Sequence, residues 1–378
     1  MIEIIEVKSQ KQLKQFISFA DTLYKTNPYR ATPLHSLEIA TLDWSKNPAF
    51  EYCEAAYFLA YRENKIVGRV AGIINTKSNE LFNEKCVRVG WLDFIDDEAV
   101  SQALFATVEN WGVSKGMNVA KGPLGFTDMD LEGMLVEGFD EMSTQAVLYN
   151  HAYYPRHIEK WGYKKDVDWL QFEIKVPKEV PQRISRMANI VKEKYGLRIL
   201  KAKSSKDFLP YAEKMFHTLN GAFQELYEFV PLSDAQIKHY TKLYFSLINP
   251  KYVCFVIDED DDVAGFGISI LSISKALIKA KGKLYPFGFI HILNALYRND
   301  TVDMHLQGVN PKYKKKGVLT IFYNEMMQAY IDNGIKTAIT SHILENNHDS
   351  FGMFEAFEHR QHLRRRSYTK DHLKTQSL

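Results

Sequence analysis

Residues 302–323 of this 378-residue chain encode a strand, a turn and a helix in succession. The run Val302–Val309 is apolar enough for a buried strand, which Pro311 prevents from continuing. A helix of apolar period is expected over residues 319–333. The turn between them includes three consecutive lysines followed by a glycine: Lys314, Lys315, Lys316 and Gly317. Lysine charge and the helix dipole both favour an anion there.

We therefore predict a phosphate-bearing ligand at this turn, which we call the lysine turn. Gly308, Val309 and Val318 flank the lysines and complete the predicted anion site. Backbone N–H groups that point outward at the start of a helix would hold the phosphate oxygens. The alternative is an ordinary solvated surface turn, because most runs of charge are simply surface.

The two halves of the chain show the same order of expected helices and strands. Each half is expected to give a strand, a helical region, a hairpin, a strand, a helix and a strand. This order predicts an α/β fold of two tandem modules, each a mixed sheet flanked by helices. We expect the modules at residues 1–175 and 197–378, with a connector at 176–196. An apolar content of 46% and a charged content of 25% suit two ordinary globular domains.

A long polar loop without regular pattern occupies residues 122–155 of the first half. Loops of this kind are often functional. Its candidates for binding a polar substrate or moving a proton are Glu132, Asn150, His151, Tyr153 and Tyr154. The alternative is structural, with the acids capping turns and the tyrosines packing between the modules.

The turn of the first half that corresponds to the lysine turn is acidic. Its carboxylates are Asp93, Asp96, Asp97 and Glu98, and a helix is expected to follow them. Carboxylates stabilise a helix N-terminus and repel a phosphate. We therefore expect a structural role for these acids and no bound phosphate in the first half.

The sequence predicts no metal site. Asp128, Asp130 and Glu132 lack the glycine and the later glutamate of a calcium loop, and no His-x-x-x-His pattern occurs on an expected helix. The three cysteines are widely spaced and odd in number, which argues against a disulfide framework and a zinc site.

Residues 272–299 form an insertion where a compact fold needs only a short turn. Apolar residues at helical spacing alternate there with cations, and Tyr285, Phe287 and Phe289 surround a proline–glycine break. This pattern is typical of a segment that lies among lipid headgroups or roofs an acyl tunnel. A helix pair packed between the modules is the alternative. We expect a cytoplasmic protein whose membrane contact, where it occurs, is peripheral and at the inner face.

The lysine turn resembles the pyrophosphate-binding loop of the GNAT acyltransferase superfamily, which holds coenzyme A. Residues 309–313 read Val-x-Pro-x-Tyr and Gly317 is in place, as in that family. Lys314 stands where glutamine or arginine is usual, and Leu319 replaces a small residue. The resemblance implies a coenzyme A ester at this turn, and none at the acidic turn of the first half.

The sequence that follows resembles the GNAT ending, in which an asparagine opens a helix. Asn347 takes that place, and the helix is expected over residues 349–358. The family's tyrosine general acid falls on Phe354 in the second half and on Ile158 in the first. Neither side chain can protonate a leaving thiolate, so another group is needed for that step.

Motifs across most of the chain are similar to those of the bacterial ceramide synthase-like N-acyltransferases, a two-module group. They lie at residues 122–125, 132–133, 138–140, 149–154, 282–288 and 308–313. The resemblance implies transfer of an acyl group from acyl-CoA or acetyl-CoA to a primary amine, such as a sphingoid base, without a metal. The catalytic candidates are His305 and Glu345 in the second half and Tyr154 in the first. A core histidine is the alternative for His305.

Three other functions stay open. Transfer of an amino acid from aminoacyl-tRNA would need a basic channel, which residues 312–316 and 360–366 could supply, although no nucleic-acid partner is expected. A small-amine acetyltransferase is disfavoured by Leu319, Phe354 and the insertion. A GNAT-like binding protein without activity is favoured by the missing tyrosines.

Overall fold

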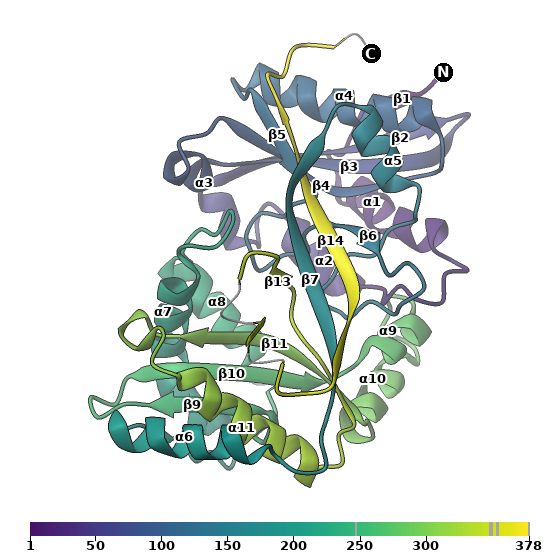
Figure 1. Ribbon diagram of the computed structural model, residues 1–378. Helices are drawn as coiled ribbons and strands as arrows, with labels where there is room; N and C mark the ends of the chain where they lie inside the picture. The colour runs from purple at the N-terminus through teal and green to yellow at the C-terminus, as the bar shows by residue number, and fades with distance from the viewer. Residues whose placement is uncertain (246–247, 348–350, 353–354, 377–378) are drawn as a thin grey trace. The chain divides into compact units, whose positions relative to one another are not determined.

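The computed structural model (Figure 1) describes residues 1–245, 248–347, 351–352 and 355–376. It divides into two compact units, each discontinuous in sequence: residues 1–170, 273–295 and 362–378 form the first, and residues 171–272 and 296–361 the second. Most of the insertion and the C-terminal strand thus pack with the first half of the chain. The module boundaries expected from the sequence divide the chain into continuous segments. The compact units are discontinuous, so they do not test these boundaries, which stay a prediction.

The sheet of the first unit has the strand order β1-β2-β3-β4-β5-β14. The strands are β1 (Glu3–Glu6), β2 (Cys53–Arg62), β3 (Lys65–Asn75), β4 (Cys86–Phe94), β5 (Val119–Gly122) and β14 (His359–Asp371), and β6 (Met134–Glu137) pairs with β14 on the side. Among the described pairings of these strands, β4 and β5 run parallel, over Cys86–Arg88. The last strand of the chain pairs with β5, with Tyr368 opposite Gly122.

Two helices cover opposite faces of this sheet, α1 (Gln10–Leu23) and α4 (Glu98–Ser114). Strand β2 shows why, because its side chains alternate between the two layers. Tyr57 and Leu59 pack with α1, whereas Phe58 and Ala60 pack in the cluster of α4. The unit also contains α2 (His35–Leu42), η1 (Pro48–Glu51), α3 (Thr76–Leu81), α5 (Tyr154–Lys160), α9 (Ser274–Ala280) and most of α10 (Gly288–Tyr297).

The second unit repeats this plan with the strand order β7-β12-β11-β10-β9-β8. Its strands are β7 (Lys164–Lys175), whose last residues belong here, β8 (Arg198–Ile199), β9 (Val253–Ile257), β10 (Val263–Leu271), β11 (Thr301–Val309) and β12 (Thr337–Ile339), followed by the short β13 (Ile343–Leu344). The succession β10-β11-α11-β12 matches β3-β4-α4-β5, and β11 and β12 are again the parallel pair. The predicted α/β fold with two modules is confirmed.

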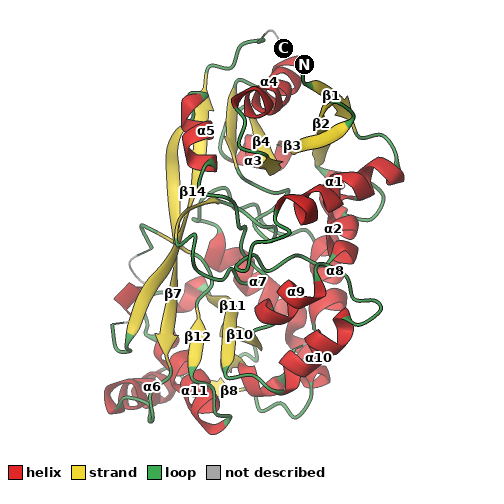
Figure 2. Cartoon of the chain, turned by 90° about the vertical axis from the view of Figure 1, so that its right-hand side faces the viewer, coloured by secondary structure: helices red, strands yellow, loops and turns green. Residues whose placement is uncertain are grey.

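The helices of the second unit lie on its sheet in the same manner. Helix α6 (Gln182–Lys194) packs on α11 (Val318–Asp332), which lies against β9 and β10, and α7 (Ala212–Phe223) packs against β10 and β11. The remaining elements are η2 (Ser205–Tyr211), α8 (Asp234–Tyr244), η3 (Pro250–Tyr252) and η4 (Pro311–Tyr313). Figure 2 shows α6 and α11 side by side.

Several local predictions differ from the structure. The helical region expected at the start of the chain is broken between α1 and α2, where Pro28 and Pro33 interrupt it. The expected connector 176–196 contains α6, whose buried Ile184, Ala188 and Val191 give it a packing face. The helix expected over 349–358, and Phe354 with it, lies largely outside the described residues.

A buried carboxylate joins β7 to β14 within the first unit. The Asp168 side chain is 0% exposed and accepts from Arg366 Nε at 2.7 Å and from Arg364 Nη1 at 3.0 Å. Asp168→Asn should lower the free energy of unfolding by about 3 kcal/mol, because it leaves two guanidinium groups without their shared counter-charge. Urea unfolding followed by circular dichroism measures this change.

The matched control is Glu54→Gln, which removes an ion pair between Lys115 and a carboxylate that is 54% exposed. Exposed pairs contribute about 0–1 kcal/mol, so this variant should unfold like the wild type. Equal losses in both variants would contradict a special role for Asp168.

Candidate functional site

The lysine turn has the backbone of an anion site. After β11 the Asn310 side chain accepts a hydrogen bond from Lys312 N–H at 3.0 Å, and Lys315 and Gly317 take left-handed φ angles of 60° and 82°. Helix α11 begins at Val318 with Gly317 as its N-cap, and no side chain caps it. The N–H of Thr320 donates to the carbonyl of Gly317 at 2.9 Å, so the N–H groups of Val318 and Leu319 are the ones at the start of α11 that can bind an anion.

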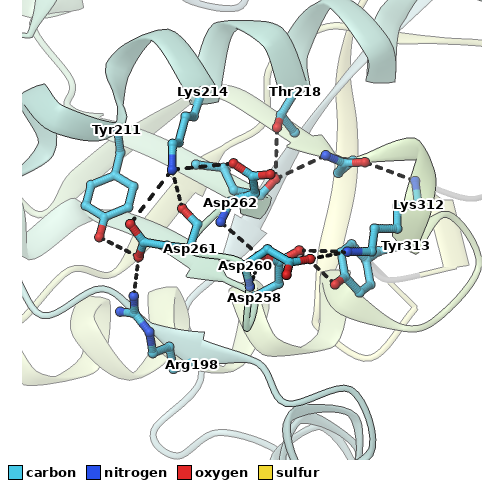
Figure 3. Close-up of polar contacts among 12 residues, drawn as sticks. Arg198, Tyr211, Lys214, Thr218, Asp258, Asp260, Asp261, Asp262, Lys312 and Tyr313 are labelled. Atoms are coloured by element: carbon cyan, nitrogen blue, oxygen red, sulfur yellow. Dashed lines mark hydrogen bonds and ion pairs between the residues drawn. The ribbon is translucent and has the colours of Figure 1, made fainter.

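A second turn holds the lysine turn in place. The buried Asp258, at the end of β9, accepts hydrogen bonds from Tyr313 Oη at 2.9 Å and from Lys312 Nζ at 3.2 Å (Figure 3). Its other oxygen accepts from the N–H groups of Asp260 and Asp262. Burial alone would raise the pKa of Asp258, but these hydrogen bonds hold that pKa below its usual value. Asp258 thus fixes the β9–β10 hairpin to the lysine turn.

The predicted lysines are not equivalent. Lys314 is ion-paired with Glu225, which offsets its charge. Lys316 Nζ lies 5.3 Å from the ring centroid of Tyr195 and 5.4 Å from that of Tyr313, a cation–π arrangement. Lys315 is exposed and has no ion pair within the described part of the chain. Lys315 and Lys316 are therefore the cations left for a ligand.

Strand β11 runs beyond its parallel neighbour. It pairs with β12 only over Thr301–Asp303, whereas it pairs with β10 as far as Val309. Residues 304–309 thus have one hydrogen-bonded neighbour, β10, among the described strands. A shallow depression with an internal volume of about 0 Å³ lies at this divergence, and its lining includes Met304, Leu306, Gln307, Tyr323, Thr340 and Ser341. The free edge can bind an extended chain through backbone hydrogen bonds.

His305 occupies a β-bulge at this divergence. Ile268 is opposite Leu306 and the next residue of β10 is opposite Met304, so His305 is the extra residue of β11. Burial and the neighbouring His342 lower the pKa of His305 to about 4. The imidazole is therefore neutral near pH 7 and poorly matched to a general base, whose pKa should lie near the working pH.

The other residues predicted for the second half lie near the end of its sheet. Gly308 and Val309 close β11 and face Phe266 and Gly265 of β10. Glu345 is half-buried and follows β13, and the N–H of Asn347 donates to the carbonyl of Leu344 at 2.9 Å. Their roles stay predictions.

The first unit contains its own polar cavity, of about 50 Å³. One water needs roughly 10–15 Å³ on the same measure, so several waters or a small polar group fit. Among the predicted residues, Asn150 and Tyr154 line it, and Glu132, His151 and Tyr153 do not. Tyr154, predicted to be catalytic, belongs to this unit, and His305 and Glu345 belong to the other.

Tyr154 is held in a buried network. Its hydroxyl donates to Asp93 Oδ1 at 3.2 Å and accepts from Tyr24 Oη at 2.9 Å and from the N–H of Phe94 at 3.1 Å. Burial raises the pKa of Tyr154 well above 10, and the charge of Asp93 adds to this effect. The phenol is therefore a protonated structural donor in this state.

The acidic turn of the first unit is only partly as predicted. Asp97 caps α4 by accepting from the N–H of Val100 at 3.1 Å, which confirms its structural role. Asp93 does not face that helix, because it is buried in an ion pair with Arg69, at 2.7 Å from Nη2 to Oδ2. The buried guanidinium of Arg69 needs a counter-charge, and Asp93 supplies it. The side chain of Asp93 is therefore not available to the turn.

The other predicted substrate residues make internal contacts. Asn150 accepts from the N–H of Leu135 at 2.6 Å. The ring of His151 stacks on that of Tyr24 with centroids 4.6 Å apart, and burial lowers the pKa of His151. Tyr153 donates to the carbonyl of Phe94. Glu132 is buried, and its carbonyl accepts from Arg365 Nη1 at 2.8 Å.

Sequence reasoning missed Arg30 and Glu38, two charged residues that line the cavity of the first unit. Arg30 lies between Pro28 and Pro33, in the segment that breaks the expected helix. An arginine between two prolines indicates a loop, and this pattern was available in the sequence.

Within the described ranges, no cluster of three or more histidine, cysteine, aspartate or glutamate side chains has the arrangement of a metal site. Asp130 accepts from the N–H groups of Phe126 and Thr127, as a turn-capping acid does. The helices of the same ranges include none long and apolar enough to cross a membrane.

Asp258→Asn should destabilise the second unit by about 1–3 kcal/mol near pH 7, because a buried hydrogen-bonded carboxylate is lost. The folded-state pKa of Asp258 is lowered, so its contribution is complete above the unfolded pKa of about 3.9 and is lost as the pH falls further. Urea unfolding at pH 7 and pH 3 should therefore show a smaller difference from wild type at pH 3 than at pH 7.

Asp260→Asn is the matched control, since Asp260 also pairs with Lys312 but its side chain is 74% exposed. It should change stability by less than about 1 kcal/mol. A loss as large as that of the Asp258 variant would show that the surface pair, and not the buried carboxylate, fixes the turn.

Comparisons with known proteins agree with this geometry. Residues 213–358 match the acetyltransferase (GNAT) family. Protein YghO of Escherichia coli (strain K12) is 25% identical over 372 residues, covering 96% of this chain and 93% of that protein. A bacterial ceramide synthase of Caulobacter vibrioides (strain NA1000 / CB15N) is 26% identical over 339 residues, covering 88% of this chain and 86% of that protein.

A solved structure shares the fold over the whole chain. It is a tandem GNAT protein from the clavulanic acid biosynthesis pathway, with a TM-score of 0.56 at 11% identity and coverage of 98% of both chains. This likeness concerns the fold alone, and it agrees with the repeated β-β-α-β succession of the two units. Residues 213–358 are therefore similar to the acetyltransferase (GNAT) family, and the whole chain shares the fold of a solved tandem GNAT protein.

Proposed function

We propose that the chain transfers an acyl group from acyl-CoA to a primary amine, with the coenzyme A ester bound by the second unit. The observation that carries this proposal is the free edge of β11, residues 304–309, followed directly by the uncapped start of α11. An extended amide-bearing arm and a diphosphate are joined in the same order in coenzyme A.

Each part of the site has a chemical task. The diphosphate would accept hydrogen bonds from the first N–H groups of α11, beside Lys315 and Lys316. The arm would pair with the edge of β11, which brings the thioester toward the bulge at His305. Backbone N–H groups there would stabilise the oxyanion that forms on the thioester carbonyl.

In the reaction a neutral amine attacks the carbonyl carbon, the C–S bond breaks, and the amine loses a proton while the thiolate gains one. Glu345, half-buried after β13, is the base that we propose. His305 then serves as a neutral hydrogen-bonding group at the bulge. Asn347, after Glu345, would contact the cofactor.

The two alternative functions can be distinguished from acyl transfer to an amine. A binding protein without turnover would bind acyl-CoA and release no free thiol in the presence of amines. Transfer from aminoacyl-tRNA would need a free basic channel, yet Arg360 pairs with Glu173, and Arg364 and Arg366 pair with Asp168. These ion pairs reduce the charge available to RNA.

Gly317→Asp should weaken acyl-CoA binding by at least about tenfold, because it adds a negative charge beside the diphosphate. Calorimetry with acyl-CoA of several chain lengths measures the effect. Gly317→Asn is the matched control: asparagine places a similar side chain at φ 82° without the charge. Equal affinities of the two variants would show that charge at this turn does not matter, and would remove the diphosphate assignment.

We also propose a long-chain or sphingoid amine as the acceptor and a peripheral membrane contact through the insertion. The similarity to a bacterial ceramide synthase supports the lipid acceptor. In α10 and the loop before it, Tyr285 is 80% exposed and Phe287 68% exposed, and Phe289 is exposed too. Large apolar side chains on a surface indicate a partner.

The charges of the insertion complement an anionic membrane. Four exposed lysines precede the aromatic residues: Lys275, Lys279, Lys281 and Lys283. The sequence from Val263 to Asn299 contains no aspartate or glutamate. Each lysine near an anionic surface contributes about 1 kcal/mol of attraction, and inserted aromatic rings add apolar burial.

The double variant Phe287→Ser/Phe289→Ser should reduce co-sedimentation with phosphatidylglycerol vesicles several-fold, because it removes the inserted rings. Leu81→Ser, which alters an exposed apolar residue of α3, is the control and should sediment like the wild type. If the double variant binds vesicles normally, or if it converts a dimeric wild type to a monomer, the segment is not a membrane contact.

A further inference from the structure

We infer that the cavity of the first unit binds a small zwitterion, a molecule with one amine and one acid group a few bonds apart. The inference concerns a site separate from the lysine turn and does not rest on acyl transfer. It follows from the charged side chains that line the cavity, which include Arg30, Glu38, Arg69 and Asp93.

Two of these charges neutralise each other. Arg69 donates to Asp93 through Nε at 2.8 Å and through Nη2 at 2.7 Å, and both side chains are almost fully buried. Arg69 also donates to the carbonyl of Phe16 at 2.9 Å. This pair is complete in itself, so it forms a wall of the cavity and leaves little charge for a ligand.

Arg30 has no such partner. It is 8% exposed, and its guanidinium carbon lies 4.7 Å from the ring centroid of Tyr24. Its side-chain hydrogen bond is a long one, from Nη1 to Thr32 Oγ1 at 3.5 Å. No carboxylate of the described chain is within ion-pair distance of it. A buried unpaired cation is costly, and a planar guanidinium fixed on a ring suits a carboxylate or phosphate.

Glu38 supplies the opposite charge. Its Oε1 accepts from the indole N–H of Trp91 at 3.1 Å, and the part of the chain that is described offers it no lysine, arginine or histidine at ion-pair distance. Trp91 has a φ of 43°, a left-handed angle that is strained for a large side chain and common at functional sites. The carboxylate of Glu38 is thus oriented by Trp91, and it interacts with the charge of Arg69 without forming an ion pair, so it can also hold an ammonium group.

The cavity is therefore lined by one cation, Arg30, and one anion, Glu38, that can each bind a charged group of a ligand. Its volume of about 50 Å³ suits a small headgroup and not a whole lipid or nucleotide. Apolar walls from Leu131, Met134 and Val147 fit a short carbon skeleton. Two sources supply this chemistry, a free α-amino acid and a phosphoethanolamine headgroup.

Calorimetry and thermal unfolding of the full chain distinguish the sources. The probes are L-serine and O-phosphoethanolamine, and the single-charge controls are ethanolamine and acetate. At least one zwitterion should bind saturably and raise the melting temperature, while each control binds at least about tenfold more weakly. The zwitterion that binds better identifies the source. Equal binding of the single-charge controls, or no binding by either zwitterion, overturns the inference.

Three variants test the two assigned residues. Arg30→Gln and Glu38→Gln should each weaken binding of the zwitterion by at least about tenfold, and Arg30→Lys should keep part of the affinity. Arg156→Gln, an exposed arginine paired with Asp96, is the control and should bind like the wild type. Unchanged affinity in a folded Arg30→Gln or Glu38→Gln protein overturns the site. Binding of acyl-CoA, measured on the same samples, reports the lysine turn independently.

Discussion

The early end of one parallel strand pair determines the architecture of the second unit's site. Strand β12 leaves β11 after Asp303, so six residues of β11 lose a neighbour while β10 still supports them. Such an edge inside a covered sheet is an aggregation hazard unless something occupies it. The shallow depression at this edge, the bulge at His305 and the uncapped start of α11 lie in succession along one strand–turn–helix unit. The site therefore needs no special loop, because it arises from where the pairing stops.

The first unit has the same architecture and a different chemistry. Its parallel pair β4–β5 also ends early, at Arg88, and the ladder of β3 and β4 shifts register between Arg69 and Ala71. Where the second unit has lysines and a bare helix start, the first has Asp97 as a cap of α4. A capped, acidic helix start cannot hold a phosphate. The cavity beside β4 instead carries separate charges of both signs, so the duplicated fold holds two unlike sites.

Much of this was predictable from sequence, and the reasons for the failures are physical. The spacing of apolar residues predicted both hairpins and both central helices, α4 and α11. These elements show a clear pattern because each buries one face against its neighbours. The lysine turn was predicted from Pro311 and Gly317, whose backbone requirements are local. The cavity of the first unit was not, because Arg30 and Asp93 are far apart in sequence and only tertiary packing brings them to it. The same reason explains Lys314, whose partner Glu225 lies on a distant segment.

The position of the last strand has a consequence for how the chain is made. Strand β14 completes the first unit by pairing with β5, although some 240 residues separate the two in sequence. Domains usually fold as they leave the ribosome, from the N-terminus onward. Here β14 can pair with β5 only after the residues between them have been synthesised, so the sheet of the first unit gains this strand after most of the second unit has been made. The order of synthesis and the order of completion are thus reversed in this chain.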